Sequence, residues 1–417
     1  MSKIIIEDVV LVYVEFPNSN PEQDLYELEE LIATAQGKIV LKCSQKREFV
    51  DPKTVVGKGK LEEIKNAIEL LDEKPEVIIF SCNLSSTQRS LLRKELNCDI
   101  IDRIDLILDI FALRATSAEG KKQVELAQIS YNLATKPDGD FSRQGAGIGT
   151  RGPGETKIET NKRTARNKIH RLKQELAEIE RHRDTSRKKR TDNGIFTVAL
   201  VGYTNAGKST LFNRLTDSKI YADDKLFATL DTTVRKLPLP CGIEVLLCDT
   251  VGFINDLPHT LLNAFKSTLE ETVRADLILN VCDISDANVS NHISVTENTL
   301  MELNAAAPII RVYNKCDKLK GTEALSDILN DTKTTGLFVS ALNGKNIDVL
   351  LDTISRSVLS CYTNVKLSVK HDSTAKIIAL LNKYNAHFDV VYSEDRATIN
   401  ATLSRKYINL FADYIVF

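Results

Sequence analysis

Residues 202–209 read GYTNAGKS and fit the pattern G-x-x-x-x-G-K-[ST]. The strand-like run Phe196–Val201 precedes them and a helical pattern over Thr210–Leu215 follows, which is the context that the pattern requires. Glycines let successive backbone N–H groups converge on phosphate oxygens, and a helix N-terminus favours negative charge. We therefore expect Lys208 to reach the β- and γ-phosphates of a nucleotide and the Ser209 hydroxyl to bind Mg²⁺.

A second segment with chemistry-bearing residues lies at the end of the next apolar strand. Residues 249–252 read DTVG and follow the run Glu244–Cys248. The Asp249 carboxylate can hold magnesium through water, and the Gly252 N–H can sense the γ-phosphate. The four letters alone mean little, but their place at a strand end after Lys208 makes a phosphate site the better interpretation.

A third segment predicts which base is bound. Residues 314–317 read NKCD and follow the apolar run Ile309–Tyr313. The Asp317 carboxylate can accept hydrogen bonds from guanine N1–H and its 2-amino group, whereas adenine has neither donor. A site built around such a bond can discriminate by roughly 10⁴–10⁵. We expect Asn314 to brace the loop, the Lys315 stem to cover the base, and residues 340–342 to complete the pocket.

Alternating elements surround these segments. Residues 1–140 predict an α/β domain with a largely parallel sheet, because β-branched runs alternate with segments of helical period. The expected strands are Asp8–Phe16, Lys38–Cys43 and Glu76–Ser81, and the expected helices are Glu22–Ala35, Leu61–Leu71, Ile101–Arg114 and Ala118–Thr135. Residues 194–360 alternate in the same way, with strands at Phe196–Val201, Glu244–Cys248, Asp276–Cys282, Ile309–Tyr313 and Gly336–Val339.

The middle of the chain, residues 141–193, differs from both. Six glycines fall within residues 139–154 and predict a loop. A helix with a narrow apolar seam is expected over Glu155–Arg183, packed against the 118–135 segment, and residues 187–194 read as a linker. Residues 157–190 hold 13 Lys/Arg and 5 Asp/Glu, although the whole chain carries −2. This local excess points to a polyanionic partner, although a solvated helical face remains an open alternative.

Composition excludes several classes of protein. Apolar residues make up 42% of the chain, which excludes overall disorder, and no apolar run is long enough to span a membrane. The N-terminus turns acidic at Glu7 and does not resemble a secretory signal. The eight cysteines form no C-x-x-C pair, so we expect reduced thiols rather than structural zinc.

On these motifs residues 194–360 look like a translation-factor-related P-loop GTPase domain, and the whole chain resembles the HflX family of ribosome-associated GTPases. Three further stretches favour the HflX family over other GTPases of this class: 55–60 (VVGKGK), 145–157 and 226–231 (LFATLD). Residues 361–417 resemble the family only weakly. Together with the residue patterns, this resemblance predicts an α/β fold in four parts: an N-terminal α/β domain (1–140), a glycine-rich loop and basic helix with linker (141–193), a GTP-binding domain with a mixed, mostly parallel sheet flanked by helices (194–360), and a small α/β C-terminal domain (361–417).

The resemblance also implies site residues. It places a magnesium-binding threonine of the first switch on Thr229, with Thr232 and Thr233 as close competitors. Phe253 stands where many GTPases carry a water-orienting glutamine, so we assign no catalytic residue and expect slow hydrolysis that a partner completes. The expected metal ligands are Ser209 and Thr229, and the expected nucleotide-binding residues are Gly202, Tyr203, Thr204, Asn205, Ala206, Gly207, Lys208, Ser209, Phe227, Ala228, Thr229, Leu230, Asp231, Asp249, Thr250, Val251, Gly252, Asn314, Lys315, Cys316, Asp317, Ser340, Ala341 and Leu342.

The implied partner is the large (50S) ribosomal subunit and its rRNA, with Mg²⁺ as cofactor of GTP and GDP. We expect a cytoplasmic protein, monomeric when free, that splits or rescues ribosomes under stress; loose membrane association is an open alternative for its location. The rival hypothesis is a ribosome-assembly GTPase that binds precursor rRNA. The 57–60 turn leaves a second phosphate site in the N-terminal domain open, although a plain strand-to-helix turn is the better interpretation.

Overall fold

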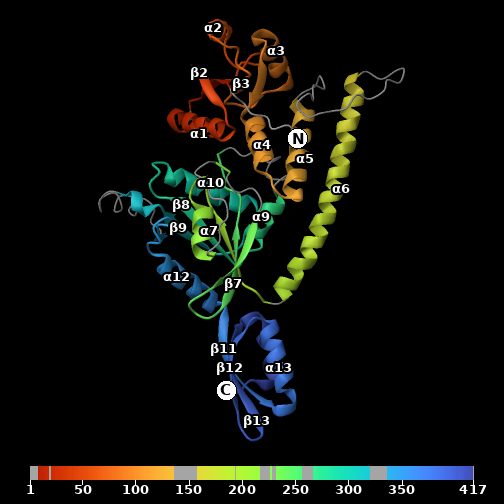
Figure 1. Ribbon diagram of the computed structural model, residues 1–417, viewed down its shortest axis with the longest axis vertical. Helices are drawn as coiled ribbons and strands as arrows, with labels where there is room; N and C mark the ends of the chain where they lie inside the picture. Colours follow the sequence, from red (N-terminus) through yellow and green to blue (C-terminus); the bar gives the residue numbers. More distant parts are fainter. Residues whose placement is uncertain are drawn as a thin grey trace. The chain divides into compact units, whose positions relative to one another are not determined.

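The computed structural model describes residues 8–17, 20–135, 157–192, 194–216, 226–227, 232–255, 266–319 and 336–416. The chain divides into two compact units (Figure 1). Unit 1 comprises Met1–Ile179, Lys225–Leu230 and Leu257–Phe265, and unit 2 comprises Glu180–Asp224, Asp231–Asp256 and Lys266–Phe417. The predicted glycine loop, residues 139–154, lies outside the described residues.

Unit 1 is built on a parallel four-stranded sheet with the order β2-β1-β3-β4. Its inner strand β1 is buried over six successive residues, as expected of a parallel strand that is covered on both faces. One face forms a core from α2, α3 and inward-facing strand residues such as Val10 and Ile78. The predicted parallel sheet is therefore confirmed. The strands are β1 (Asp8–Glu15), β2 (Lys38–Lys46), β3 (Val77–Phe80) and β4 (Asp99–Asp102), and the helices are α1 (Pro21–Thr34), α2 (Lys58–Glu69), α3 (Ser86–Leu96), α4 (Arg103–Arg114) and α5 (Ala118–Thr135).

Between residues 86 and 102 the structure adds two elements that the sequence analysis did not predict, α3 and β4. The prediction of a helix from Ile101 is wrong at its start, because Ile101 pairs with Ile79 in the sheet. The helix α4 begins after Asp102, whose side chain accepts a hydrogen bond from the Asp105 N–H in a capping box. An aspartate that caps a helix also ends the strand before it.

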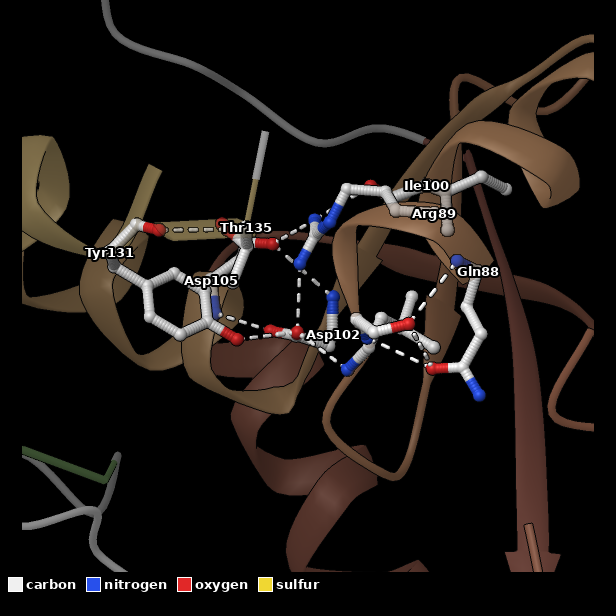
Figure 2. Close-up of polar contacts among 9 residues, drawn as sticks. Gln88, Arg89, Ile100, Asp102, Asp105, Tyr131 and Thr135 are labelled. Carbon is white, nitrogen blue, oxygen red and sulfur yellow. Dashed lines mark hydrogen bonds and ion pairs between the residues drawn. The ribbon is translucent and has the colours of Figure 1, made fainter. Parts of the chain in front are cut away.

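A buried ionic cluster joins α3, β4, α4 and α5 (Figure 2). The Arg89 guanidinium forms ion pairs with Asp102, at 2.8 Å, and with Asp105. The Tyr131 hydroxyl donates to Asp102 Oδ2 at 2.6 Å, and the Leu84 N–H donates to the same oxygen. Burial raises the pKa of Asp102, and Asp105 raises it further, while Arg89 opposes both effects. Because an unpaired buried charge is costly, this cluster fixes α5 on the sheet domain.

Helix α6 (Lys157–Asp192) continues past the predicted end of the basic helix. The predicted linker at residues 187–194 is wrong, since residues 187–192 are helical; lysine and arginine favour helix. The turn after the helix contains Gly194 at φ +69°, where a Cβ would lie 2.7 Å from the Tyr407 ring. The predicted packing of α6 on α5 is confirmed by a shared core of Ile129, Ala165 and Leu172, and the two helices run side by side in Figure 1.

Unit 2 contains a mixed six-stranded sheet with the order β10-β9-β8-β5-β7-β6. All neighbours are parallel except β6, which pairs antiparallel with β7 and was not predicted. Helices α7 and α12 pack on one face and α10 packs on the other. The elements are β5 (Thr197–Val201), α7 (Lys208–Thr216), β6 (Thr233–Pro238), β7 (Glu244–Asp249), α9 (Lys266–Val273), β8 (Leu277–Asp283), α10 (Val289–Glu302), β9 (Ile309–Asn314), η1 (Cys316–Lys318), β10 (Gly336–Phe338) and α12 (Ile347–Ser360).

The C-terminal part of unit 2 is a three-stranded antiparallel sheet with the order β11-β13-β12. A core of Leu367, Ile377, Ile399 and Phe411 joins the sheet to its helix and to the last 3₁₀ turn. The sequence predicts a strand at Val365–Val369 and a helix at Ser373–Tyr384, and the structure confirms one of each there; the two later strands were not predicted. The elements are β11 (Tyr362–Lys370), α13 (His371–Lys383), β12 (His387–Tyr392), β13 (Arg396–Ser404) and η2 (Arg405–Tyr414). Within the described part of the chain, every helix is too short or too polar to cross a bilayer.

Candidate functional site

The loop at residues 202–207 joins β5 to α7, as predicted, and its backbone requires glycine at two positions. Gly202 has φ +147° and Gly207 has φ +88°. A Cβ on Gly202 would lie 2.1 Å from Val281 O, and one on Gly207 would lie 2.3 Å from Asn314 Nδ2. Both substitutions would therefore clash and strain the backbone. The loop therefore lies against the ends of β8 and β9 with no room for a side chain at either glycine.

Lys208 begins α7 and bends back over this loop. Its Nζ donates to Tyr203 O at 2.8 Å and to Gly202 O at 3.1 Å, and the residue is buried. Burial lowers the pKa of Lys208 to about 8, while the nearby Asp249 carboxylate opposes this shift. A buried ammonium whose pKa is lowered in this way gains strongly from an anion placed beside it.

Ser209 and Asp249 place two oxygen atoms together at the ends of α7 and β7. The Ser209 hydroxyl donates to Asp249 Oδ2 at 2.8 Å, and Asp249 is fully buried at the end of its strand. Hydroxyl and carboxylate oxygens are the hard ligands that Mg²⁺ prefers, either directly or through water. These residues therefore fit a magnesium ion bound together with phosphate oxygens.

Asn314, at the end of β9, connects two of the predicted segments. Its Nδ2 donates to Ala206 O at 2.9 Å, and its Oδ1 accepts from the Ala341 N–H at 3.0 Å. The neighbouring Lys315 donates from Nζ to Asn205 O at 2.8 Å and pairs with Asp283 at 2.7 Å. One side chain thus ties the phosphate loop to the 340–342 segment, and the next ties the loop to β8.

Asp317 and Ser340 lie next to these residues and complete one cluster of hydrogen-bonded segments, made of residues 202–209, 249–252, 314–317 and 340–342. The Ser340 hydroxyl accepts from the Asn343 N–H at 3.1 Å and donates to Asp317 Oδ1 at 2.5 Å. This leaves Oδ2 of Asp317 as the oxygen not used by Ser340. Ala341 is buried, Leu342 is 69% exposed, and Cys316 is buried beneath the loop, where burial raises the pKa of its thiol.

Residues 250–253 lie directly against the phosphate loop. The Thr250 hydroxyl donates to Leu200 O at 2.6 Å, and Val251 is buried. A Cβ on Gly252 would lie 2.9 Å from the Thr204 Cα and 3.0 Å from Lys208 Nζ. The Phe253 side chain is buried.

The predicted first-switch segment is only partly described. The structure places Phe227 in unit 1, where its buried ring lies edge-to-face with Phe111 at a centroid distance of 4.6 Å. The other four predicted residues of this segment lie outside the described residues: Ala228, Thr229, Leu230 and Asp231. Of the two competitors of Thr229, Thr232 precedes β6, and Thr233 is the first residue of β6 and pairs with Asp249.

Sequence reasoning missed two residues that hold the cluster together. Asp283 ends β8 and binds Lys315, and Arg214 of α7 donates from Nε to Ala341 O at 3.0 Å. The position of Asp283 directly after a buried strand was a usable signal, because polar residues at the carboxyl ends of parallel strands gather at one edge. No comparable signal marked Arg214.

Comparison with known families covers most of the chain. Residues 22–112 match the family "GTP-binding GTPase N-terminal", residues 114–190 match "GTP-binding GTPase Middle Region", and residues 197–315 match "50S ribosome-binding GTPase". A protein named GTPase HflX from Lacrimispora saccharolytica is 43% identical over 99% of this chain and 97% of its own length. Another protein of that name, from Caldanaerobacter subterraneus subsp. tengcongensis, is 46% identical over 84% of this chain and 81% of its own.

The chain belongs to the HflX family of GTPases.

The resemblance stated from the motifs is thereby confirmed, and so are the P-loop GTPase fold and GTP hydrolysis as the activity of this HflX-family chain. Among solved structures, the chain is similar to one described as "crystal structure of SsGBP and GDP complex", with 25% identity over 84% of this chain and 98% of that one and a TM-score of 0.47.

Proposed function

We propose that the segments 202–209, 249–252, 314–317 and 340–342 bind GTP and GDP together with Mg²⁺. The observation that carries this proposal is the double hydrogen bond of Asn314, to Ala206 O and from the Ala341 N–H, because it sets phosphate-binding and base-binding segments in one rigid frame. Ligands of open α/β sheets bind at the carboxyl ends of the strands, and all four segments lie there.

Each side chain then has one role. Lys208 binds the β- and γ-phosphates, and the Gly252 N–H binds the γ-phosphate beside it. The Asp317 oxygen that Ser340 leaves unused accepts from guanine. Magnesium, when bound, neutralises charge on the β- and γ-phosphates; Ser209 would hold it directly, Asp249 through water, and Thr229 of the first switch as a further ligand.

Among the residues that the structure describes, we assign no base to the hydrolytic step. Phe253 is apolar and buried, so its side chain cannot orient a water molecule by hydrogen bonding. We infer that intrinsic hydrolysis is slow and that the macromolecular partner completes the site. No catalytic residue is assigned.

We further propose that the partner is the large ribosomal subunit and its rRNA, and that GTP binding drives ribosome splitting or rescue under stress in the cytoplasm. The family that matches residues 197–315 is described as a 50S ribosome-binding GTPase, which supports this choice. Helix α6 supplies positive charge: Arg166, Lys173 and Arg181 are exposed on it. We also propose that the chain has four functional parts, with boundaries at residues 140, 193 and 360. Helix α6 belongs to the second part and ends at Asp192.

Charge reversal on α6 tests the rRNA proposal. Replacing Arg166, Lys173 and Arg181 by glutamate should weaken 50S binding and lower the slope of log K against log salt by about two to three, since each lost phosphate contact removes about 0.7–0.9. Intrinsic GTP hydrolysis should not change, because none of these residues belongs to the proposed nucleotide site. Filter binding of 50S particles measures the slope when the salt concentration is varied from about 50 to about 200 mM.

The matched control reverses Lys366, Lys370 and Lys376, which are exposed in the C-terminal part of unit 2. This variant should bind 50S particles with the parent's slope. If the control lost the slope and the α6 variant kept it, α6 would be a solvated face and the RNA contact would lie in residues 361–417.

A further inference from the structure

Tyr203, the second residue of the phosphate loop, has a side chain with no role in the nucleotide site described above. The residue is 6% exposed, and its ring lies flat on the His292 ring of α10, with centroids 3.8 Å apart and 10° between the planes. Burial lowers the pKa of His292, while Asp286 and Asp283 act against this shift. The ring that faces Tyr203 is therefore the neutral imidazole near pH 7.

The Tyr203 hydroxyl reaches the residues that follow Gly252. It accepts a hydrogen bond from the Asn255 N–H at 2.9 Å. Two backbone bonds run beside it: the Phe253 N–H donates to Gly202 O at 3.1 Å, and the Thr204 N–H donates to Phe253 O at 2.8 Å. Three hydrogen bonds thus hold residues 253–255 against residues 202–204.

These three hydrogen bonds, called the Tyr203 bracket below, set the position of Gly252. Gly252 precedes the bracketed residues directly and lies so close to Thr204 and Lys208 that a Cβ would not fit. Lys208 itself is bonded to the carbonyls of Gly202 and Tyr203. Any shift of residues 253–255 away from the phosphate loop would therefore move the Gly252 N–H away from the Lys208 ammonium.

A small cavity borders the ring pair. Its volume is about 40 Å³, and Tyr203, Thr204, Asn280 and His292 are among its lining residues. Within the described residues, neither amide atom of the buried Asn280 has a hydrogen-bond partner, so the cavity wall is polar. The His292 stack and the bond from Asn255 are two contacts that orient the Tyr203 side chain beside this cavity.

We propose that Tyr203 is a positioning residue for the γ-phosphate: its hydroxyl holds residues 253–255, and so keeps the Gly252 N–H at the place where a γ-phosphate binds. This inference rests on the proposed nucleotide site. The side chain acts through Gly252 and does not contact the nucleotide. GTP and GDP are distinguished because only GTP reaches the pre-set N–H.

Tyr203→Phe tests the inference, because it keeps the ring and the stack and removes only the oxygen. A neutral hydrogen bond contributes about 0.5–1.5 kcal/mol, so the ratio of affinities for the nonhydrolysable analogue GMPPNP and for GDP should fall about twofold to tenfold. GMPPNP affinity should fall further than GDP affinity, because only the analogue reaches the Gly252 N–H. The matched control is Tyr362→Phe in β11, a buried tyrosine outside the site, which should leave the ratio unchanged.

A second readout needs no nucleotide. Hydrogen exchange at the Asn255 amide should become about threefold faster or more in Tyr203→Phe and stay at the parent rate in Tyr362→Phe. Unchanged exchange at Asn255 together with an unchanged nucleotide ratio would overturn the positioning role. If the parent protein bound neither GMPPNP nor GDP, the proposed nucleotide site would fail instead, whatever the exchange data gave.

Discussion

Lys208→Ala is expected to abolish GTP binding at micromolar protein while the chain stays folded. The variant lacks the ammonium and therefore its charge-assisted bonds to two phosphates. Each bond contributes about 1.5–3 kcal/mol, so the affinity for GTP should fall by about a hundredfold or more. The fold should survive, because the Nζ bonds seen within the described residues go to two loop carbonyls, and alanine is a good helix residue at the start of α7. Titration calorimetry with GTP and GDP measures the loss, and the thermal midpoint reports folding.

The matched control is Lys236→Ala. Lys236 lies on β6 in the same unit, is exposed, and pairs with Glu244 at 2.6 Å. An exposed pair of this kind contributes little, so this variant should bind GTP like the parent. Wild-type GTP hydrolysis by Lys208→Ala would contradict the assignment of the phosphate site.

The lowered pKa of Lys208 adds a pH signature to the same experiment. A bound phosphate stabilises the ammonium and raises the pKa of Lys208 above its value of about 8 in the free protein. The complex then holds more protons than the free protein, so the association constant should rise as pH falls from about 9 to 7 and level off below. Lys236→Ala, which leaves Lys208 in place, should keep this pH dependence.

Asp317→Asn should convert the base preference from guanine to xanthine. Asn343 donates to the Ser340 hydroxyl, whose proton is then directed at Asp317 Oδ1. In the variant the amide oxygen takes this position, and Nδ2 faces the base as a donor to the 2-oxo group of xanthine. GTP meets a donor instead of an acceptor, so its advantage of roughly 10⁴–10⁵ over unsuited bases should be lost.

Calorimetric titration of the parent and of Asp317→Asn with GTP, ATP and XTP measures this switch. Asp348→Asn, an exchange of the same kind in the first turn of α12, is the matched control and should keep the parent's preference. Equal affinity of the parent for GTP and ATP would refute the base pocket.

Which segments gather at the proposed nucleotide site could largely be predicted from sequence, because each of them begins at the end of a strand or close behind it. A buried strand is recognisable from its apolar run, and parallel strands bring their carboxyl ends to one edge. The register of Asp249, Asn314 and Ser340 at that edge follows from this rule. Contacts that join the segments were not predictable, since the reach of Asn314 to Ala206 depends on the sheet order β9-β8-β5.

The misplaced elements also have physical causes. Strand β4 is only four residues long and leads straight into the capping box of α4, so its apolar letters were assigned to the helix. The end of α6 was set too early because a run of like charges suggested a linker, whereas the helix continues to the residues before Gly194. The Tyr203 bracket joins residues about fifty positions apart, and a single tyrosine within a loop gives no sequence signal of it.

Sedimentation through sucrose gradients tests the central claim most directly. The protein is incubated with 70S ribosomes and with separated 30S and 50S subunits, in the presence of GTP, GDP or GMPPNP. The account predicts comigration with 50S particles in GMPPNP, release in GDP, and a shift of 70S particles to subunits with GTP. Equal sedimentation in all three nucleotide states, or comigration with precursor particles alone, would contradict it.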